Sequence, residues 1–342
     1  MDAVFFKQPG GAEVLEYGEI PTPQPGAGEV LVRLEAAALN HMDLFVRQGL
    51  HGLTPKLPHI LGADGAGRVA AVGEGVSDWQ AGKKVVINAS ICLTKDEFTE
   101  SGQENLCRSW ELLGETLPGT YAQYVVVPQE NLLACPEAFP SEKAAAAAMV
   151  YLTAWHSLAT KGHLEPGETV LVVGSSGGVN SASIQIAKYL GATVIAVGSN
   201  EAKLQLAESL GADYLINRSK EDWSGAAYRI TNKRGVDVVV DNIGSTFPLS
   251  MRAARKGGRI LNVGRTGAAT VEINLGYIFG KHLSIIGSTM GTHADFTEVM
   301  KLVFEGKLLP VMDYCFPLNE ARAAHERLEA GQQLGKITLQ ID

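Results

Sequence analysis

The stretch LVVGSSGGVNSASIQIAK, residues 171–188, decides the fold of this chain. It begins inside an apolar run, 168–174, that has the composition of a buried strand. A glycine-containing turn follows, and a helix with apolar residues at helical spacing begins near Val179. A turn of this kind aims backbone N–H groups and the positive end of a helix dipole at one point, where a pyrophosphate can bind. The strand before the turn and the helix after it supply the context that a bare glycine pattern lacks.

The same alternation of strand and helix continues along the chain. We expect further strands at 192–198, 212–218, 236–244, 257–264 and 282–290, and helices at 180–191 and 200–211. Strands that are apolar on both faces and are joined by helices through short loops form a parallel sheet covered on both sides. The pattern therefore predicts a doubly wound α/β domain of about six strands.

The rest of the chain has a different texture. The first 130 residues are rich in glycine, proline and short valine-rich runs, which is typical of a β-rich domain with irregular loops. An alanine-rich helix is expected between Ser141, as its N-cap, and Gly162, as its stop. The last fifty residues contain one helix and one strand that can return to the first domain. A length of 342 residues with 46% hydrophobic content suits two domains.

Composition and charge exclude several classes of protein. A net charge of -8, without any lysine- or arginine-rich run, excludes a nucleic acid as partner. The N-terminus lacks the features of a signal peptide, and the longest apolar stretch, 144–152, is shorter than the roughly 18 residues of a membrane helix. We expect a cytoplasmic protein that acts on a small molecule. Its four cysteines form no C-x-x-C pair and are expected to be reduced.

The glycine turn defines a set of candidate phosphate-binding residues: Gly174, Ser175, Ser176, Gly177, Gly178 and Val179. In a G-x-x-G-x-x-G reading of the turn, Asn180 stands at the third glycine. Asparagine can cap a helix, but here it would crowd the helix–strand contact that glycine normally permits.

The residues at the end of the second strand determine which dinucleotide binds. An NAD site places Asp or Glu there to accept hydrogen bonds from the ribose hydroxyls, but this chain has Ser199. Lys203 and Arg218 lie nearby in sequence and would attract a 2′-phosphate, which an acidic side chain would repel. The pattern predicts NADP(H) as cofactor.

Four further stretches carry a resemblance to a known family. They are GEVLVRLEAAALNHMD (28–43), PHILGADGAGRVAAVGEGV (58–76), GTYAQYVVV (119–127) and AAAAAMVYLTAWHSL (144–158). Together with the glycine turn, they resemble the medium-chain dehydrogenase/reductase superfamily essentially from end to end. The resemblance implies a GroES-like catalytic domain, residues 1–127 and 295–342, around a Rossmann dinucleotide-binding domain, residues 128–294.

The resemblance also implies where zinc would bind in related enzymes. Their catalytic ligands, two cysteines and a histidine, are matched here by Asn40, Met149 and Ala63, none of which suits zinc. Asp64 matches a glutamate beside that zinc, but one carboxylate is not a site. Met42 replaces the hydroxyl that relays a proton in zinc-type alcohol dehydrogenases.

The structural zinc of such enzymes has equally few ligands in this chain. Its four positions correspond to Leu93, Asp96, Thr99 and Cys107, with Cys92 one residue out of register. We therefore expect no metal, although an atypical site near Asp64 or near the two cysteines stays open.

The zinc-free quinone oxidoreductase branch of the family carries asparagine at the position of Asn40. The resemblance implies hydride transfer from NADPH to a quinone or an α,β-unsaturated carbonyl, acceptors that need no strong electrophilic activation. The Asn40 amide could donate to the developing oxyanion or simply bond within its turn. Thr153 is the second catalytic candidate, in addition to Asn40. Phe45 and Met149 are candidates for the substrate pocket. Asn242, Val263 and Gly264 are candidates for binding the cofactor.

Two alternatives remain open. One is a zinc-type alcohol dehydrogenase that holds its metal through Asp64, His59 or His41. The other is a catalytically silent NADPH-binding sensor or partner protein. The resemblance further implies a homodimer that pairs through an edge strand at 282–288, where an apolar edge invites pairing. The physiological acceptor and the direction of the reaction are not determined by the sequence.

Overall fold

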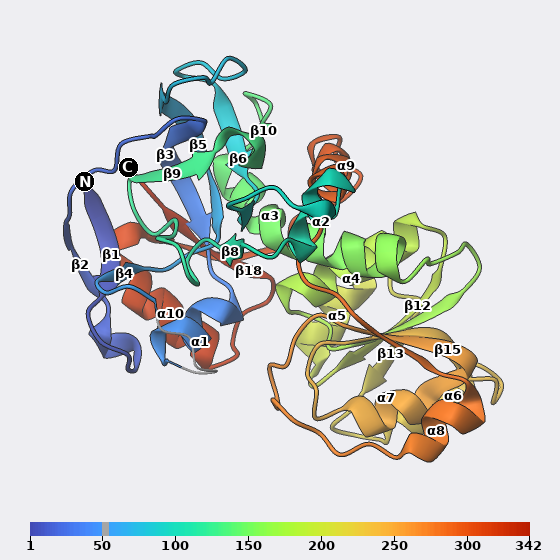
Figure 1. Cartoon of the computed structure of the whole chain (residues 1–342). Coiled ribbons are helices and arrows are strands. Elements are labelled where there is room, and N and C mark those ends of the chain that lie inside the picture. The colour runs from blue at the N-terminus through green and yellow to red at the C-terminus, as the bar shows by residue number, and fades with distance from the viewer. Residues whose placement is uncertain (50–54) are drawn as a thin grey trace. The chain divides into compact units, whose positions relative to one another are not determined.

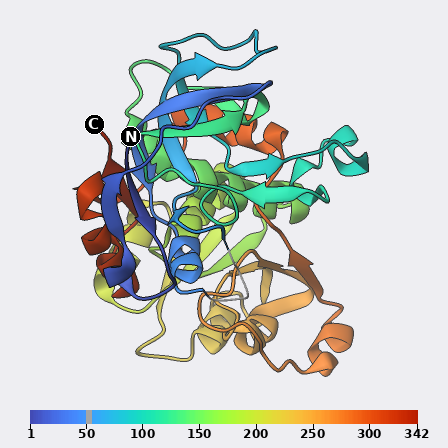
Figure 2. The ribbon, with the colours of Figure 1, turned by 60° about the vertical axis from the view of Figure 1, so that its left-hand side comes forward.

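The computed structural model describes residues 1–49 and 55–342, which divide into two compact units (Figure 1). The first unit contains Met1–Met149, Thr292–Glu305 and Pro310–Asp342. The second contains Val150–Gly291 and Gly306–Leu309. Both chain ends therefore belong to the first unit, as Figure 2 also shows. Within the described ranges, no helix is both long and apolar enough to cross a membrane.

The second unit is built on a parallel sheet. Its strands are β11 (Thr169–Val173), β12 (Thr193–Gly198), β13 (Tyr214–Asn217), β14 (Val236–Asp241), β15 (Ala254–Asn262) and β16 (Ser284–Gly287). Their order is β13-β12-β11-β14-β15-β16, and all neighbours run parallel. The connecting helices are α4 (Gly178–Tyr189), α5 (Glu201–Ser209), α6 (Trp223–Ile230), α7 (Phe247–Ala253) and α8 (Leu275–Lys281). The predicted doubly wound sheet is confirmed.

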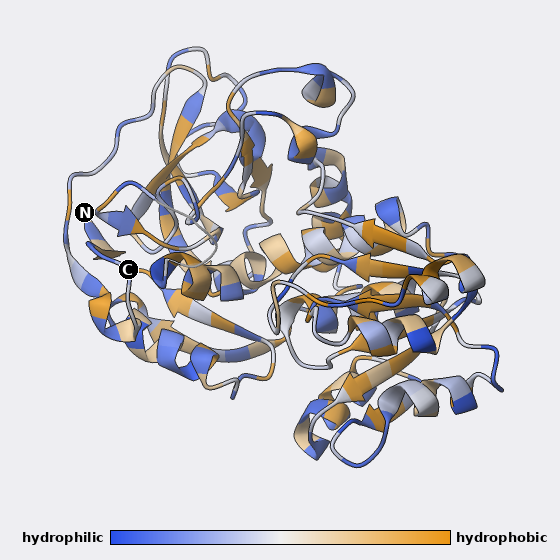
Figure 3. Cartoon of the chain, turned by 60° about the horizontal axis from the view of Figure 1, so that its bottom comes forward, coloured by the Kyte–Doolittle hydropathy of each residue, from blue (hydrophilic) through white to orange (hydrophobic). Residues whose placement is uncertain are grey.

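The burial of this sheet explains why it is parallel. Leu171 and Val173 of β11, Ile195 of β12, Val239 of β14 and Ile260 of β15 lie in one apolar core. Figure 3 shows the strands of this sheet as mainly hydrophobic, whereas the helices that cover it also carry hydrophilic residues. Strands without a polar face must be covered on both sides, which crossover helices achieve.

The first unit is β-rich, as predicted. Its main sheet has the order β10-β6-β5-β3-β18-β17, with β9 also paired to β3. These strands are β3 (Glu29–Ala38), β5 (Asp64–Val72), β6 (Lys84–Ile87), β9 (Tyr124–Pro128), β10 (Leu132–Ala134), β17 (Met312–Pro317) and β18 (Lys336–Gln340). The last strand, β18, pairs antiparallel with β3, so the C-terminal segment completes the first unit.

Smaller elements surround this sheet. They are β1 (Asp2–Phe6), β2 (Glu16–Glu19), β4 (His59–Ile60), β7 (Ser90–Cys92), β8 (Trp110–Leu112), α1 (His41–Arg47), α2 (Glu97–Glu100), α9 (His293–Phe304) and α10 (Ala321–Glu329). Short 3-10 turns cover Ala12–Val14, Glu104–Leu106, Gln129–Asn131 and Leu318–Glu320. The strand β1 pairs with both β2 and β4.

The boundary between the units falls inside α3 (Ser141–Trp155), later in the chain than residue 127. Residues after 127 join the first unit because β10 pairs with β6 and because the Lys84 ammonium donates to the carbonyl of Phe139. Ser141 is the first residue of α3, and its hydroxyl donates to Glu35 rather than capping the helix, so the predicted N-cap is wrong. The helix continues as a π-helix, His156–Lys161, and ends at Gly162 as predicted.

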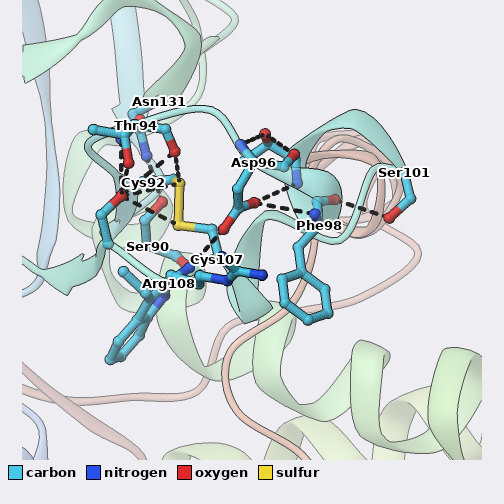
Figure 4. The surroundings of a disulfide bond; sticks show 12 residues. Ser90, Cys92, Thr94, Asp96, Phe98, Ser101, Cys107, Arg108 and Asn131 are labelled. Atoms are coloured by element: carbon cyan, nitrogen blue, oxygen red, sulfur yellow. Dashed lines mark hydrogen bonds between the residues drawn. A yellow bond between two sulfur atoms is a disulfide. The ribbon is translucent and has the colours of Figure 1, made fainter.

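A disulfide joins Cys92 and Cys107 (Figure 4). The prediction of reduced thiols is therefore wrong for this pair, while Cys135 and Cys315 are free. The antiparallel pairing of β7 and β8 places Cys92 opposite Trp110, only three residues from Cys107. Asp96 fixes the connecting lobe because its carboxylate accepts hydrogen bonds from backbone N–H groups, including that of Arg108. The spacing of the two cysteines could not reveal this proximity.

A buried ionic cluster connects α1 with α10. Arg47, fully buried, donates to the ring Nδ1 of His325 at 3.0 Å and is also paired with Glu329. Since arginine only donates, His325 accepts at Nδ1 and is neutral. Burial, and then the charge of Arg47, lowers the pKa of His325 to about 3. Burial has the opposite effect on an acid and raises the pKa of Asp43 to about 6.

These shifts predict how His325 changes stability with pH. The unfolded chain protonates this histidine near pH 6.5, well above the value in the folded protein. Between these values the unfolded state binds more protons, so acidification destabilises the fold. Relative to His325→Gln, the wild type should lose up to about 1.4 kcal/mol per pH unit below pH 6.

The measurement is urea unfolding of both proteins between pH 4 and 8. Taking the difference between them removes the opposite contribution of Asp43, whose raised pKa favours the folded state at low pH. Curves that stay parallel over this range would show that His325 has the same pKa in the folded and unfolded states, which would contradict the prediction.

Candidate active site

The first candidate site is a buried polar cluster around Asn40. The Asn40 amide Nδ2 donates to Asp64 Oδ2 at 2.9 Å. The Lys336 ammonium donates to Asn40 Oδ1 at 2.7 Å, to Asp64 Oδ2 at 2.8 Å and to the carbonyl of Leu39 at 2.7 Å. The exposed fraction is 0% for Asp64, 4% for Lys336 and 9% for Asn40. The cluster is therefore a desolvated ion pair, and the Asn40 amide is hydrogen-bonded to both of its charged groups.

Three adjacent strands create this cluster. Asn40 follows β3 and is the N-cap residue of α1, and Asp64 begins β5 directly opposite Ala38. Lys336 begins β18, the strand on the other side of β3. The sequence analysis missed Lys336 because it lies 272 residues from Asp64. The sequence did contain an indication of its role, because a lysine at the first position of a buried terminal strand needs a partner of opposite charge.

Of the residues predicted for this site, the structure connects Met149 to Asn40 through Asp64. Asp64 Oδ1 accepts from the backbone N–H of Met149 at 2.7 Å, and Ala63 is buried beside Asp64. Phe45 lies half-buried on α1. Asp43 holds the turn in place, because its carboxylate accepts from the N–H groups of Asn40 and Gly62.

This donor set does not fit zinc. An amide, a methyl group and a thioether stand at the three ligand positions, and the carboxylate oxygen nearest to them is paired with an ammonium. His59, one of the alternative ligands, is bonded to the carbonyl of Gly114. Across residues 1–49 and 55–342, no group of three His, Cys, Asp or Glu side chains is arranged to hold a metal ion. The two thiols of the other candidate metal site form the disulfide.

The second candidate site is the glycine turn of the second unit. Gly174 has a φ of +107°, and a Cβ there would lie 2.2 Å from Asn180 Nδ2. Helix α4 starts at Gly178 with Gly177 as N-cap, so Asn180 does not cap the helix. Its side chain instead donates to the carbonyl of Val173 at 3.4 Å. Where a glycine would let the helix pack closely against the strand, Asn180 forms a hydrogen bond instead. Gly174 leaves room for the Asn180 side chain because it has no Cβ.

The turn fits a dinucleotide pyrophosphate. The hydroxyl of Ser175 is buried and has no hydrogen-bond partner within the described part of the chain. Ser176 is also buried, and the first-turn N–H groups of α4, from Gly178 and Val179, need partners outside the helix. A phosphate group at this helix terminus would satisfy these donors.

Asn242 connects the segments at this edge of the sheet. Its Nδ2 donates to Asn180 Oδ1 at 3.3 Å, and its Oδ1 accepts from the N–H of Val263 at 3.1 Å. A Cβ at Gly264 would lie 3.3 Å from the Asn242 carbonyl. Asn242, Val263 and Gly264 are therefore brought together. Thr153, on α3, directs its hydroxyl toward Met290 Sδ at 3.8 Å.

Of the residues predicted to select the dinucleotide, Ser199 follows β12, Lys203 lies in the first turn of α5 and Arg218 follows β13. The N–H of Arg218 donates to the carbonyl of Gly198, so the backbone of Arg218 lies beside that of Ser199. The carbonyl of Ser199 in turn accepts from the Ser219 hydroxyl. Ser199 and Lys203 are half-buried and Arg218 is exposed. Ser199 therefore stands where an NAD site carries an acid, with Lys203 in the following helix and Arg218 after the neighbouring strand.

Comparison with known proteins identifies the family of this chain. The family model of the alcohol dehydrogenase GroES-like domain matches residues 26–137, and that of the zinc-binding dehydrogenase matches residues 178–305. The chain is 33% identical to an NAD-dependent alcohol dehydrogenase of Saccharolobus solfataricus, covering 95% of this chain and 96% of the relative. The chain is a medium-chain dehydrogenase/reductase.

Other members of this superfamily are similarly close. An acryloyl-coenzyme A reductase of Sulfurisphaera tokodaii is 32% identical, covering 96% of this chain and 97% of its own. A human quinone oxidoreductase is 29% identical, covering 99% and 97% respectively. A solved structure of an NAD-dependent alcohol dehydrogenase superposes with a TM-score of 0.94 at 42% identity, covering both chains completely. This medium-chain dehydrogenase/reductase is therefore an oxidoreductase that uses a nicotinamide dinucleotide.

Gly174→Ala tests the dinucleotide site of this medium-chain dehydrogenase/reductase. The added Cβ would collide with Asn180 and strain a backbone of positive φ, displacing the turn. We expect affinity for NADPH and NADH to fall about tenfold or more, which is about 1.4 kcal/mol. The measurement is titration of nucleotide fluorescence.

Gly167→Ala is the matched control. Gly167 also has a positive φ, of +86°, but a Cβ there would meet nothing within 4 Å. Both variants should lose about 1–3 kcal/mol of stability to backbone strain, but only Gly174→Ala should lose affinity. Unchanged nucleotide binding by Gly174→Ala would contradict the assignment of the turn.

Proposed function

We propose that this protein is a metal-independent, NADPH-dependent reductase of quinones or α,β-unsaturated carbonyl compounds. The observation that carries the proposal is the Lys336 ammonium, which binds the oxygens of Asn40 and Asp64. In zinc-type relatives, as the sequence resemblance implies, these positions surround a metal. A lysine paired there cannot act as the Lewis acid that alcohol oxidation needs.

The proposed chemistry suits a site without a metal. When bound, the reduced nicotinamide supplies a hydride, which electron-poor conjugated acceptors take without strong activation. Negative charge then develops on the acceptor oxygen, and a fixed hydrogen-bond donor stabilises it. Asn40 provides such a donor in its Nδ2 group. Phe45 and Met149 contribute apolar surface that excludes water.

Two relatives support the class of substrate. The names of the acryloyl-coenzyme A reductase and the human quinone oxidoreductase both describe conjugated acceptors. Other relatives are named NAD-dependent alcohol dehydrogenases, which favours the metal-dependent alternative. That alternative has little support from ligand chemistry, because Asp64 is paired with Lys336 and His59 is bonded to Gly114. A silent NADPH-binding protein is the third possibility.

The preference for NADPH rests on Ser199, Lys203 and Arg218. Ser199 and Arg218 follow two adjacent strands and Lys203 lies in α5, and their hydroxyl and cationic groups suit a 2′-phosphate. Because some relatives are named NAD-dependent, the comparisons support a nicotinamide dinucleotide in general, and the preference for NADPH is proposed from these three residues.

The cytoplasmic location also belongs to this proposal. The Cys92–Cys107 disulfide stands against it, since reducing compartments rarely preserve such bonds.

The first test is oxidation of NADPH and NADH with 1,4-benzoquinone, 9,10-phenanthrenequinone and acryloyl-coenzyme A, with and without a chelator. We expect turnover that prefers NADPH and is unchanged by the chelator. Activity on simple alcohols alone, or its loss on chelation, would contradict the proposal. Tight NADPH binding without turnover would favour the silent alternative.

Substitutions in the same assay test the dinucleotide preference. Lys203→Ala and Arg218→Ala should each raise KM for NADPH about 10- to 100-fold, as expected for loss of a charged hydrogen bond, with little effect on NADH. Lys256→Ala, which removes an exposed lysine at the start of β15, is the matched control.

We further propose a homodimer that pairs through β16 and the adjacent α8. Leu275 and Phe279 of α8 are 66% and 76% exposed, and Ile285 of β16 is 41% exposed. An edge strand with apolar neighbours favours pairing with a second copy. Phe279→Asp should shift the protein from dimer to monomer in light scattering at micromolar concentration. A monomeric wild type would contradict the proposal.

A further inference from the structure

We infer that Lys336 is a positioning residue of the proposed reductase, and that its ammonium fixes the Asn40 amide so that Nδ2 faces the acceptor oxygen. The inference rests on the proposed function. It assigns a role to Lys336, a residue near the end of the chain that the sequence motifs did not single out.

The hydrogen bonds of Lys336 show that it acts through another residue. An ammonium group has three N–H donors. Those of Lys336 are directed to the Leu39 carbonyl, Asn40 Oδ1 and Asp64 Oδ2, at 2.7, 2.7 and 2.8 Å. Every donor is therefore used within the protein. Lys336 has no N–H left for a substrate.

The same contacts determine the orientation of the Asn40 amide. The two ends of an amide have nearly the same shape, so charge decides between them. An ammonium only donates, which requires Oδ1 to face Lys336, and a carboxylate only accepts, which requires Nδ2 to face Asp64. A flipped amide would place donor against donor and acceptor against acceptor. Such an arrangement is costly in a buried site.

This orientation leaves one donor available. The Nδ2 group carries two N–H bonds, and Asp64 accepts one. For the described residues, Asp64 is the one acceptor that this group meets. The ammonium on Oδ1 also polarises the amide, which strengthens the remaining N–H as a donor. That N–H is the group that would stabilise negative charge on the acceptor oxygen.

Asp64 is itself held in place. Its second oxygen, Oδ1, accepts from the N–H of Met149 at 2.7 Å, so the carboxylate cannot rotate without losing this bond. The sum of charges in the cluster is zero, since one ammonium faces one carboxylate. Lys336 therefore supplies the positive charge that a metal provides elsewhere, and uses it for orientation instead of Lewis acidity.

The test separates positioning from stability. Lys336→Met alone would leave the Asp64 charge buried and unpaired. Such a variant can fail to fold, so it is not a sufficient test by itself. The double variant Lys336→Met with Asp64→Asn keeps the site neutral but no longer sets the amide of Asn40. We expect it to fold and bind NADPH within about threefold of wild type. Its kcat should fall about 100-fold, as after loss of an oxyanion donor.

Two comparisons show whether the effect passes through Asn40. Asn40→Ala should lower kcat to a similar extent, and adding it to the double variant should cause little further loss, because coupled groups are not additive. Lys84→Met, which removes another buried lysine that donates to the Phe139 carbonyl, should lower stability without lowering kcat. A double variant that keeps full kcat, or losses that multiply, would overturn the inference.

A second readout does not depend on turnover. In protein labelled with ¹⁵N-asparagine, the Asn40 side-chain resonances are assigned by their loss in Asn40→Ala. Wild type should show one sharp pair, which broadens or splits in the double variant. Unchanged resonances would overturn the inference. Failure of the wild type to reduce any conjugated acceptor would instead overturn the proposed function, and the two failures are thereby distinguished.

Discussion

The buried ion pair between Lys336 and Asp64 is the interaction on which the first unit depends. It joins the start of the last strand to the start of β5, on either side of β3. Two charges removed from water are tolerated only when they are paired and their remaining hydrogen bonds are satisfied. Here Leu39, Asn40 and Met149 satisfy them. The ends of the chain are therefore brought together by a polar requirement as well as by strand pairing.

The second unit depends on a different constraint. Its strands are apolar on both faces, so helices must cover them, and a group of polar side chains lies at the carboxyl ends of the strands. There a chain of amide contacts runs from the Val173 carbonyl through Asn180 and Asn242 to the N–H of Val263. These bonds hold the turn after β11 and the segment after β15 in a fixed arrangement. The candidate pyrophosphate site therefore lies beside segments that are hydrogen-bonded to each other.

The cluster around Asn40 combines a fixed turn with a set of side chains that does not fit zinc. Asp43 fixes the turn through the N–H groups of Asn40 and Gly62. An amide, a methyl group and a thioether stand at the positions that the resemblance assigns to zinc ligands, and an ammonium supplies positive charge beside them. An oriented hydrogen-bond donor activates an acceptor less strongly than a metal does. The weaker activation suits acceptors that are already electron-poor.

The sequence by itself determined the parallel sheet and the β-rich first unit, and it pointed to Asn40, Asp64 and the glycine turn as candidate site residues. These features depend on local periodicity and on short motifs, which a single sequence displays directly. The tertiary structure alone decided that Lys336 pairs with Asp64, that Cys92 is joined to Cys107 and that Asn180 bonds to Val173 instead of capping its helix. Each of these contacts depends on where the packed backbone places a side chain. Two of them also join residues from different strands or loops, whose separation along the chain carries no information about their distance in space.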